Sequence, residues 1–299
     1  MPVDPAEFRH IESPAVRFTQ DEAGLGKLEV ASALATAFIF VQGAHLTEWT
    51  YAGGEPLLFV SSRSYFAPGK AIRGGVPVCF PWFAARTGHS GSPSHGFLRT
   101  ADWKVDSVKE GPNGVVTVEF SIAASQSTRE LWPHQFCARY SLSIGRYLEL
   151  NFEVENTGGA PFTFEEALHT YFRVSDIRSI SVLGLEGAEY LDKVVGGTRK
   201  RQGPEPLRFS GETDRVFVNT TSTCELEDPG LHRRISVAKT GSATTVVWNP
   251  WATKAAALAD FGDSEWQGML CIETANAGEN AVTLASGETH CMRATINVG

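Results

Sequence analysis

Two apolar segments of the sequence each contain a side chain that can donate or accept a proton. His169 lies in the apolar and aromatic stretch 165–172, and Glu273 ends the apolar run 269–273. An imidazole titrates near neutral pH, and a partly buried carboxylate has a raised pKa that suits a general base. Each residue also has a plainer interpretation. His169 can be a core histidine with its hydrogen bonds satisfied, and Glu273 can lie on the solvent face of a strand.

Two further segments combine a polar side chain with glycine. His95 precedes Gly96 in a turn-like segment, and Arg73 precedes two glycines and a rigid apolar stretch. Glycine lets the backbone approach a ligand closely, and the planar guanidinium of arginine binds phosphate or carboxylate oxygens. The same glycines can instead serve only to shape turns. A separate basic cluster at 199–201 is expected to be a solvated loop.

Other catalytic and cofactor motifs are missing from the sequence. It contains no GxxxxGK[ST] phosphate loop, no complete dinucleotide fingerprint and no GxSxG nucleophile elbow. The five cysteines are scattered, odd in number and without CxxC spacing, which argues against a disulfide framework or a zinc site. We therefore expect neither a metal nor a nucleotide cofactor, and we expect most of the cysteines to be buried thiols.

Alternation of apolar and polar residues with a period of two is the main signal for secondary structure. It predicts strands, which are separated by turn residues such as Asn-Gly and Gly-Gly. The best helical candidate is a short alanine-rich segment, 252–259, which is too short to organise an alternating strand and helix fold. The sequence therefore predicts an all-β fold of mostly antiparallel strands with few short helices. The clearest strands are 116–120, 140–144, 148–154, 235–238, 244–248, 281–284 and 292–296, with residues 286–288 turning the last pair.

The composition is that of an ordinary globular protein. The length of 299 residues fits one large β domain as well as two, and no linker is evident, so we expect one unit spanning residues 1–299. A net charge of −8 argues against a nucleic-acid partner. Residues 1–20 lack a signal-peptide pattern, and no run of about 18 apolar residues occurs. We expect a cytoplasmic protein that does not bind membranes.

Seven segments of the chain, taken in order, resemble the aldose 1-epimerase superfamily. Within it they are most similar to the branch of glucose-6-phosphate 1-epimerases, or hexose-6-phosphate mutarotases. Each motif alone is weak, and their shared order and spacing over about residues 20–298 carry the resemblance. The segments are GAHLTEW (43–49), IRGGVP with FPWF (72–83), HGFLR (95–99), LHTYF (168–172), YLDK (190–193), VWNPW (247–251) and CIE (271–273).

The resemblance implies a fold and a set of roles. The fold is a galactose-mutarotase-like β-supersandwich, in which one curved sheet forms an open cleft for a sugar. His169 matches the general acid of the family and Glu273 its general base. Arg73 and Arg99 match arginines that hold the substrate, including its 6-phosphate, and Asp192 matches an aspartate that contacts the sugar.

The segment around His95 is also implied to bind substrate, with one departure from the family pattern. Related enzymes often have glutamine immediately before the His-Gly pair, whereas this chain has Ser94. Because the serine side chain is shorter, we expect Ser94 to reach a sugar hydroxyl only through water. The preference among hexoses is therefore expected to differ.

These residue types suit the chemistry of mutarotation. Opening a pyranose ring needs a base at the anomeric hydroxyl and an acid at the ring oxygen. The expected activity is interconversion of the α and β anomers of glucose 6-phosphate, without a metal, nucleotide or covalent intermediate. Two alternatives stay open: an aldose 1-epimerase for unphosphorylated sugars, and a non-catalytic carbohydrate-binding module on the same fold. We expect a monomer whose partner is a small sugar phosphate.

Overall fold

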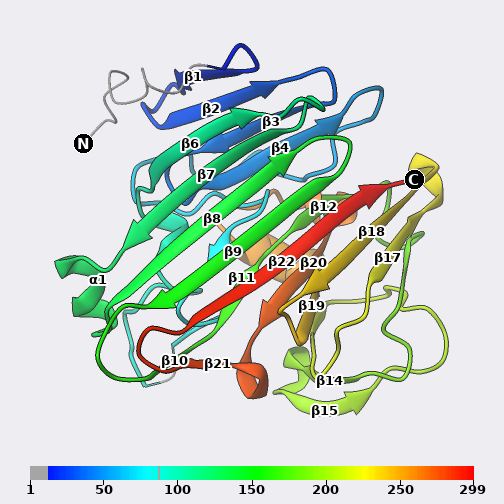
Figure 1. Ribbon diagram of the computed structural model, residues 1–299. Helices are drawn as coiled ribbons and strands as arrows, with labels where there is room; N and C mark the ends of the chain where they lie inside the picture. Colours follow the sequence, from blue (N-terminus) through cyan, green and yellow to red (C-terminus); the bar gives the residue numbers. More distant parts are fainter. Residues whose placement is uncertain (1–12, 87) are drawn as a thin grey trace.

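The computed structural model describes residues 13–86 and 88–299. Residues 1–12 and residue 87 lie outside the described residues. Residues 1–12 are part of the segment 1–20, which was expected to lack a signal peptide. Two eight-stranded sheets pack against each other, and a four-stranded sheet lies beside them toward the amino-terminal end (Figure 1). The predicted all-β class with mostly antiparallel strands is confirmed, since neighbouring strands pair antiparallel throughout the named ladders.

One eight-stranded sheet, which we call the outer sheet, forms the front layer in Figure 1. The strands predicted at 116–120, 140–144 and 148–154 are confirmed as three neighbours in it. Buried and half-buried residues alternate along the strand at Leu148–Asn156, because one face packs on the core and the other meets solvent. In spatial order its strands are β13 (Ser181–Leu183), β17 (Cys224–Asp228), β18 (Arg233–Thr240), β22 (Thr289–Val298), β9 (Leu148–Asn156), β8 (Phe136–Ile144), β7 (Val116–Ala123) and β6 (Lys104–Glu110).

The other eight-stranded sheet, which we call the inner sheet, carries the candidate catalytic residues. Glu273 lies on its strand Met269–Asn276, all of whose residues are buried. The predicted strand 244–248 is confirmed as its neighbour. In spatial order the strands are β15 (Thr198–Arg201), β14 (Glu189–Asp192), β16 (Thr213–Phe217), β19 (Thr244–Asn249), β20 (Met269–Asn276), β11 (Glu166–Leu168) and β5 (Val78–Cys79), and β12 (Tyr171–Arg173) also pairs with β20.

The basic segment 199–201 is a strand, so the prediction of a loop was wrong. It forms most of β15 at the edge of the inner sheet, where its arginines bind a carboxylate on the neighbouring strand. Arg199 lies 3.2 Å and Arg201 2.8 Å from carboxylate oxygens of Glu189. Cross-strand charge pairs of this kind stabilise an exposed edge strand. The expected exposure to solvent is confirmed along the whole of β15.

The last two predicted strands do not pair with each other. β21 (Val282–Leu284) pairs with β10 (Phe162–Phe164), whereas β22 lies in the outer sheet. Both edges of β22 are already occupied, by β9 and by β18. Residues 286–288 therefore turn the chain from one sheet to another and do not close a hairpin.

Helices are few and short in the described part of the chain, as expected. The helix predicted at 252–259 is confirmed as α2 (Trp251–Ala257). A second helix, α1 (Gln126–Leu131), was not predicted, although Ser125 and Thr128 form a capping box at its start. No helix among the described residues is long and apolar enough to cross a bilayer. The remaining elements are β1 (Val16–Gln20), β2 (Gly26–Ala31), β3 (Ala35–Phe40), β4 (His45–Tyr51), η2 (Leu98–Thr100), η3 (Lys193–Val195), η4 (Pro229–Leu231), η5 (Glu265–Gly268) and η6 (Gly278–Asn280).

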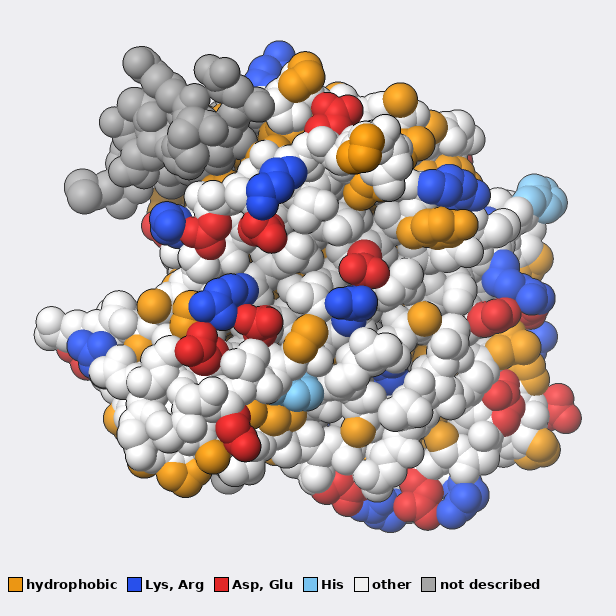
Figure 2. Space-filling view, in the orientation of Figure 1, with side chains coloured by type: hydrophobic (Ala, Val, Ile, Leu, Met, Phe, Trp, Pro, Cys, Tyr) orange, Lys and Arg blue, Asp and Glu red, His pale blue; other side chains and the backbone are white. Residues whose placement is uncertain are grey.

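The outward face of the outer sheet carries charges of both signs (Figure 2). Arg139 on β8, for example, lies 2.7 Å from Glu153 and 3.2 Å from Glu155 on β9. Exposed pairs of this kind contribute roughly 0 to 1 kcal/mol each to stability. This face is therefore a mixed, solvated surface, and the main stabilising contacts lie between the sheets.

Phe80 lies at the centre of an aromatic cluster between the layers. Its side chain is fully buried, and burial of one such ring stabilises the fold by about 1.5 to 3 kcal/mol. The cluster joins the outer sheet to the segment that leads from β5 toward the candidate site. Ring centroids within 5.2 to 6.3 Å of that of Phe80 belong to Phe97, Trp132, Phe136, Phe152 and Phe164.

A pair formed by the half-buried His290 and the buried Glu166 joins the two large sheets. Nε2 of His290 on β22 lies 2.9 Å from Oε1 of Glu166 on β11, and Asn276 on β20 donates a hydrogen bond to the same oxygen at 2.8 Å. Burial lowers the pKa of His290, but the hydrogen bond and the charge of Glu166 together raise it above its usual value. The protonated imidazole is therefore stabilised in the folded protein, and the pair fixes the strand that leads to His169.

We expect His290→Ala to lower the free energy of unfolding by about 2 kcal/mol at acidic pH. Because folding raises the pKa of His290, its contribution is complete below the unfolded pKa of about 6.5 and is lost as pH rises through the folded value. Urea unfolding at about pH 5.5 and about pH 9 measures this, and the deficit of the variant should shrink at the higher pH. An equal deficit at both pH values would contradict the assigned charge.

Candidate active site

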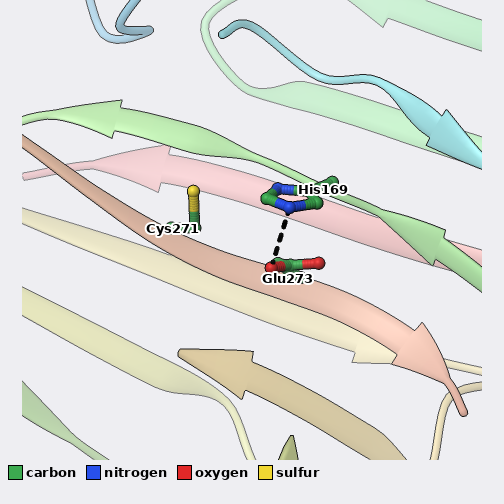
Figure 3. A group of neighbouring side chains, drawn as sticks. All are labelled: His169, Cys271 and Glu273. Carbon is green, nitrogen blue, oxygen red and sulfur yellow. Dashed lines mark ion pairs between the residues drawn. The ribbon is translucent and has the colours of Figure 1, made fainter. Parts of the chain in front are cut away.

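His169 and Glu273 face each other across adjacent strand segments. β11 and β12 pair with β20 in one unbroken register, which matches Leu168 with Thr274. One step along each strand from that pair sets His169 opposite Glu273. Side chains directly opposed on one face have Cβ atoms about 4.5 to 5.5 Å apart. Nε2 of His169 accordingly lies 3.3 Å from Oε1 of Glu273 (Figure 3).

The segment that carries Arg73 runs along the other edge of the strand that carries His169. The backbone N–H of His169 donates to the carbonyl of Pro77 at 3.0 Å, and that of Tyr171 donates to the carbonyl of Gly75 at 2.9 Å. These bonds continue the pairing of β11 with β5. His169 therefore lies in the middle of a three-stranded arrangement, with Glu273 on one side and the arginine segment on the other.

Burial disfavours the charged form of both candidate catalytic groups. The side chain of His169 is 8% exposed and that of Glu273 only 1%. Burial, followed by the charges of His95 and Arg99, lowers the pKa of His169 well below its usual value. Burial, followed by the charge of Asp214, raises the pKa of Glu273 well above 4.5. Neither carboxylate oxygen of Glu273 has a hydrogen-bond partner among the described residues, so both can accept a hydroxyl.

Three aromatic rings hold the imidazole of His169 in place. The ring of Tyr171 stacks on it, with centroids 4.7 Å apart and an interplanar angle of 11°. The rings of His95 and Trp248 meet it edge to face, at 5.4 and 6.1 Å. Because its faces and edges are packed, the orientation of the imidazole toward Glu273 is fixed by its neighbours.

A cavity of about 410 Å³ opens above this pair. A cavity of this size is within the range of small-molecule sites. The inner sheet forms its floor, and loops, η3 and α2 supply its walls. Six of the seven predicted site residues line it: His169, Glu273, Arg73, Arg99, Ser94 and His95.

The two arginines differ in their surroundings. Nε and one terminal nitrogen of Arg73 donate to Asp260 at 3.2 and 3.1 Å, and the other terminal nitrogen donates to the hydroxyl of Tyr171 at 3.3 Å. Arg99 donates to the backbone carbonyl of Ser94 at 2.7 Å. Among the described residues no carboxylate lies within ion-pair distance of Arg99. Its charge is therefore available to an anionic ligand, whereas that of Arg73 is compensated.

The glycines beside Arg73 and His95 serve the packing of the chain. A Cβ on Gly74 would lie 2.4 Å from the carbonyl oxygen of Phe59, and one on Gly96 would lie 1.7 Å from that of Phe80. Both glycines also have positive φ angles, of 129° and 72°. Close approach occurs as predicted, but the partner is the backbone of a neighbouring segment. Tight backbone contact thus places the two side chains on the cavity wall.

Asp192 lies outside the set of cavity residues. Its carboxylate binds Nζ of Lys200 at 2.8 Å on β15. The aspartate that lines the cavity is Asp214 on β16, which is paired in register with Trp248 on β19. Burial raises the pKa of Asp214, as expected for a carboxyl on the cavity wall.

Further cavity residues received no role from the sequence. Lys193 and Trp248 belong to motifs that carry the family resemblance, so their motifs were the available signal. Asp214 and Lys254 belong to none, and only the fold brings them to the cavity. Sequence alone offered no means of finding these two, because their places depend on strand order and on the packing of α2.

Cys271 lies next to His169 and Glu273, on the same face of β20 as Glu273 (Figure 3). Its sulfur, a nitrogen of His169 and an oxygen of Glu273 all lie within 4.8 Å of one another, an arrangement that could in principle hold a metal ion. Burial raises the pKa of the Cys271 thiol well above its usual value, so the thiol is protonated in the protein described here.

A second hollow of about 470 Å³ lies near η4, around His232 and Arg233. Arg233 donates to the backbone carbonyls of Arg173 and Pro56, and Arg234 binds Glu225 at 3.1 Å. The residues that line this hollow include no buried pair like His169 and Glu273. We therefore take the cavity above Glu273 as the candidate active site.

Comparison with known proteins places the chain in a family. Residues 27–296 match the family model described as aldose 1-epimerase. The chain belongs to the aldose 1-epimerase family. This confirms the resemblance inferred from the seven ordered motifs.

Individual members of the aldose 1-epimerase family match this chain along most of its length. A protein of Cenchrus ciliaris, provisionally named a glucose-6-phosphate 1-epimerase, is 36% identical over 287 residues, or 93% of this chain and 86% of that protein. A crystal structure of a provisionally named mutarotase from Salmonella typhimurium has a TM-score of 0.89 at 31% identity, covering 96% of this chain and 94% of that one. A galactose mutarotase-like protein of Clostridium acetobutylicum shares the fold, with a TM-score of 0.71 at 15% identity over 95% of this chain and 98% of that one. The predicted galactose-mutarotase-like architecture is confirmed.

In this member of the aldose 1-epimerase family, we expect Glu273→Met to raise the free energy of unfolding by about 1 to 2 kcal/mol near neutral pH. Folding raises the pKa of Glu273, so its contribution is complete below the unfolded pKa of about 4.3 and is lost as pH rises toward the folded value. The gain from the substitution should therefore grow with pH. Urea unfolding measures it, with Glu149→Met on the exposed face of β9 as the control. A gain that is flat or falls with pH would refute the raised pKa.

Proposed function

We propose that this protein is a hexose-6-phosphate mutarotase that interconverts the α and β anomers of glucose 6-phosphate. The observation that carries the proposal is the contact of 3.3 Å between a buried imidazole and a buried carboxylate at the floor of a sugar-sized cavity. The names of its relatives support glucose 6-phosphate as the substrate. Free thiols at all five cysteines suit a reducing compartment, so we place the enzyme in the cytoplasm. We also propose that it acts as a monomer.

The reaction requires one proton to leave a sugar oxygen while another arrives. Glu273 acts as the base and takes the proton of the anomeric hydroxyl, and His169 acts as the acid and protonates the ring oxygen, which opens the ring. Rotation about the C1–C2 bond presents the other face of the aldehyde. Closure then runs the two transfers in reverse, so the pair returns to its starting protonation state after each turnover.

Burial of the pair helps this exchange. The pair enters the reaction with a single proton, since neither a bare carboxylate nor a bare imidazolium is favoured alone in the buried site. The directions of the two pKa shifts favour that proton on Glu273, and its transfer to His169, 3.3 Å away, leaves Glu273 as the carboxylate that the reaction needs. Because the two groups titrate together, the apparent pKa values of activity belong to the pair.

The phosphate is bound by the uncompensated cations of the cavity. Arg99 and Lys193 line it, and among the described residues neither has a carboxylate within ion-pair distance. Lys254, by contrast, lies 2.9 Å from Glu212. A phosphate group carries nearly two negative charges at neutral pH, so it favours the cations whose charge is not already balanced.

We expect the purified protein to accelerate anomer exchange of glucose 6-phosphate, measured by exchange NMR spectroscopy. Glu273→Gln should lower kcat by about 10²- to 10⁴-fold, because it removes the general base and keeps the shape of the side chain. Glu149→Gln on the outer sheet is the control. Unchanged exchange in Glu273→Gln would disprove the acid and base assignment. Saturable sugar binding with no exchange by the wild type would instead indicate a binding module.

We expect Arg99→Ala to separate phosphorylated from free sugars. The substitution should lower kcat/KM for glucose 6-phosphate by about 10- to 100-fold, the cost of hydrogen bonds to a charged group, and affect glucose far less. Kinetics with both sugars measure the ratio. Equal losses for the two would favour the alternative substrate class, an unphosphorylated sugar.

A further inference from the structure

We infer that Asp260 is a positioning residue that orients Arg73 toward the substrate, an inference that rests on the proposed function. The carboxylate of Asp260 accepts hydrogen bonds from Nε and from one terminal nitrogen of Arg73, at 3.2 and 3.1 Å. The two side chains are largely buried, at 22% and 16% exposure. A two-point bond of this kind fixes the plane of a guanidinium as well as its position.

The hydrogen-bond donors of Arg73 can be counted. A guanidinium has five N–H groups. Asp260 takes two of them, and the hydroxyl of Tyr171 takes a third at 3.3 Å. One N–H is left on each terminal nitrogen. Arg73, which lines the cavity, therefore keeps two N–H donors that no described residue accepts and that a substrate can use.

Asp260 also balances the positive charge of Arg73. Arg73 therefore contributes oriented hydrogen-bond donors to the cavity more than net positive charge. Arg99, which has no carboxylate partner among the described residues, supplies the charge. The two arginines thus differ in function: Arg99 attracts the anionic group, and Arg73 donates oriented hydrogen bonds. The orientation of Arg73 depends on Asp260, which is far away in the sequence.

The loop that carries Asp260 is firmly held. Phe261 is fully buried and packs on Phe59, with ring centroids 5.7 Å apart. The carboxylate of Glu265 accepts backbone N–H groups from Gly262 at 2.9 Å and from Ser62 at 2.8 Å. The loop after α2 is therefore anchored, directly after Asp260, to the segment that leads to Arg73, as precise positioning requires.

The same contacts extend to the catalytic imidazole. Tyr171 accepts a hydrogen bond from Arg73, and its ring stacks on that of His169 at 4.7 Å. Loosening Arg73 therefore releases the ring that supports His169. Loss of Asp260 should affect the chemical step as well as substrate binding.

The test is a double-mutant cycle between Asp260 and Arg73. We expect Asp260→Asn to lower kcat/KM for glucose 6-phosphate by about 10- to 100-fold, with a rise in KM and a fall in kcat, since displacement by about 1 Å costs this much. In an Arg73→Ala background the same substitution should change kcat/KM by less than about twofold, because the group that it positions is gone. Asp263→Asn is the matched control. It lies in the same loop and binds Arg63 at 2.7 Å, but both side chains are exposed.

Two results would overturn the inference. One is an Asp260→Asn enzyme with the kinetics of the wild type. The other is an equal loss with and without Arg73, which would show that Asp260 acts on stability or on another group. If Asp260→Asn fails to fold by circular dichroism, Asp260→Ser replaces it in the same cycle. Calorimetric binding of glucose 6-phosphate gives the same cycle without turnover, so a wild type that binds but does not exchange anomers would refute the proposed function and leave this inference testable.

Discussion

The register between the segment 166–173 and β20 is the constraint on which the site depends. It sets His169 opposite Glu273, and a slip of one residue would send one side chain of the pair to the opposite face of the sheet. Several contacts hold the register. The ion pair between Glu166 and His290 joins β11 to the outer sheet, and hydrogen bonds from the backbone N–H groups of His169 and Tyr171 to the carbonyls of Pro77 and Gly75 hold the other edge. Most of the surrounding architecture can be understood as support for this alignment.

These contacts are needed because burial of His169 and Glu273 is unfavourable for folding. A carboxyl group with almost no exposure and no hydrogen-bond partner among the described residues costs stability, and its raised pKa is the electrostatic measure of that cost. The aromatic cluster around Phe80 and the extensive strand pairing offset it. The same burial gives the carboxyl group a pKa that suits proton exchange with a sugar hydroxyl. Stability and reactivity at Glu273 are therefore in opposition.

The cations of the cavity differ in whether a carboxylate balances their charge. Arg73 and Lys254 are balanced by Asp260 and Glu212. Among the described residues Arg99 has no carboxylate partner. Under the proposed function, the phosphate of the substrate would be drawn to Arg99, and this would orient the sugar ring above His169 and Glu273.

The sequence by itself determined the all-β class, the positions of seven of the 22 strands among the described residues and the identity of six cavity residues, because alternation and short motifs are local properties of the chain. It did not determine which strands pair. Only the register sets Glu273 beside His169, and segment 199–201 is a strand because it pairs with β14. Asp192 was expected to contact the sugar, whereas strand order puts Asp214 on the cavity wall, and nothing local marks Asp260 as the partner of Arg73. Such contacts join residues far apart in the chain, so only the tertiary structure could decide them.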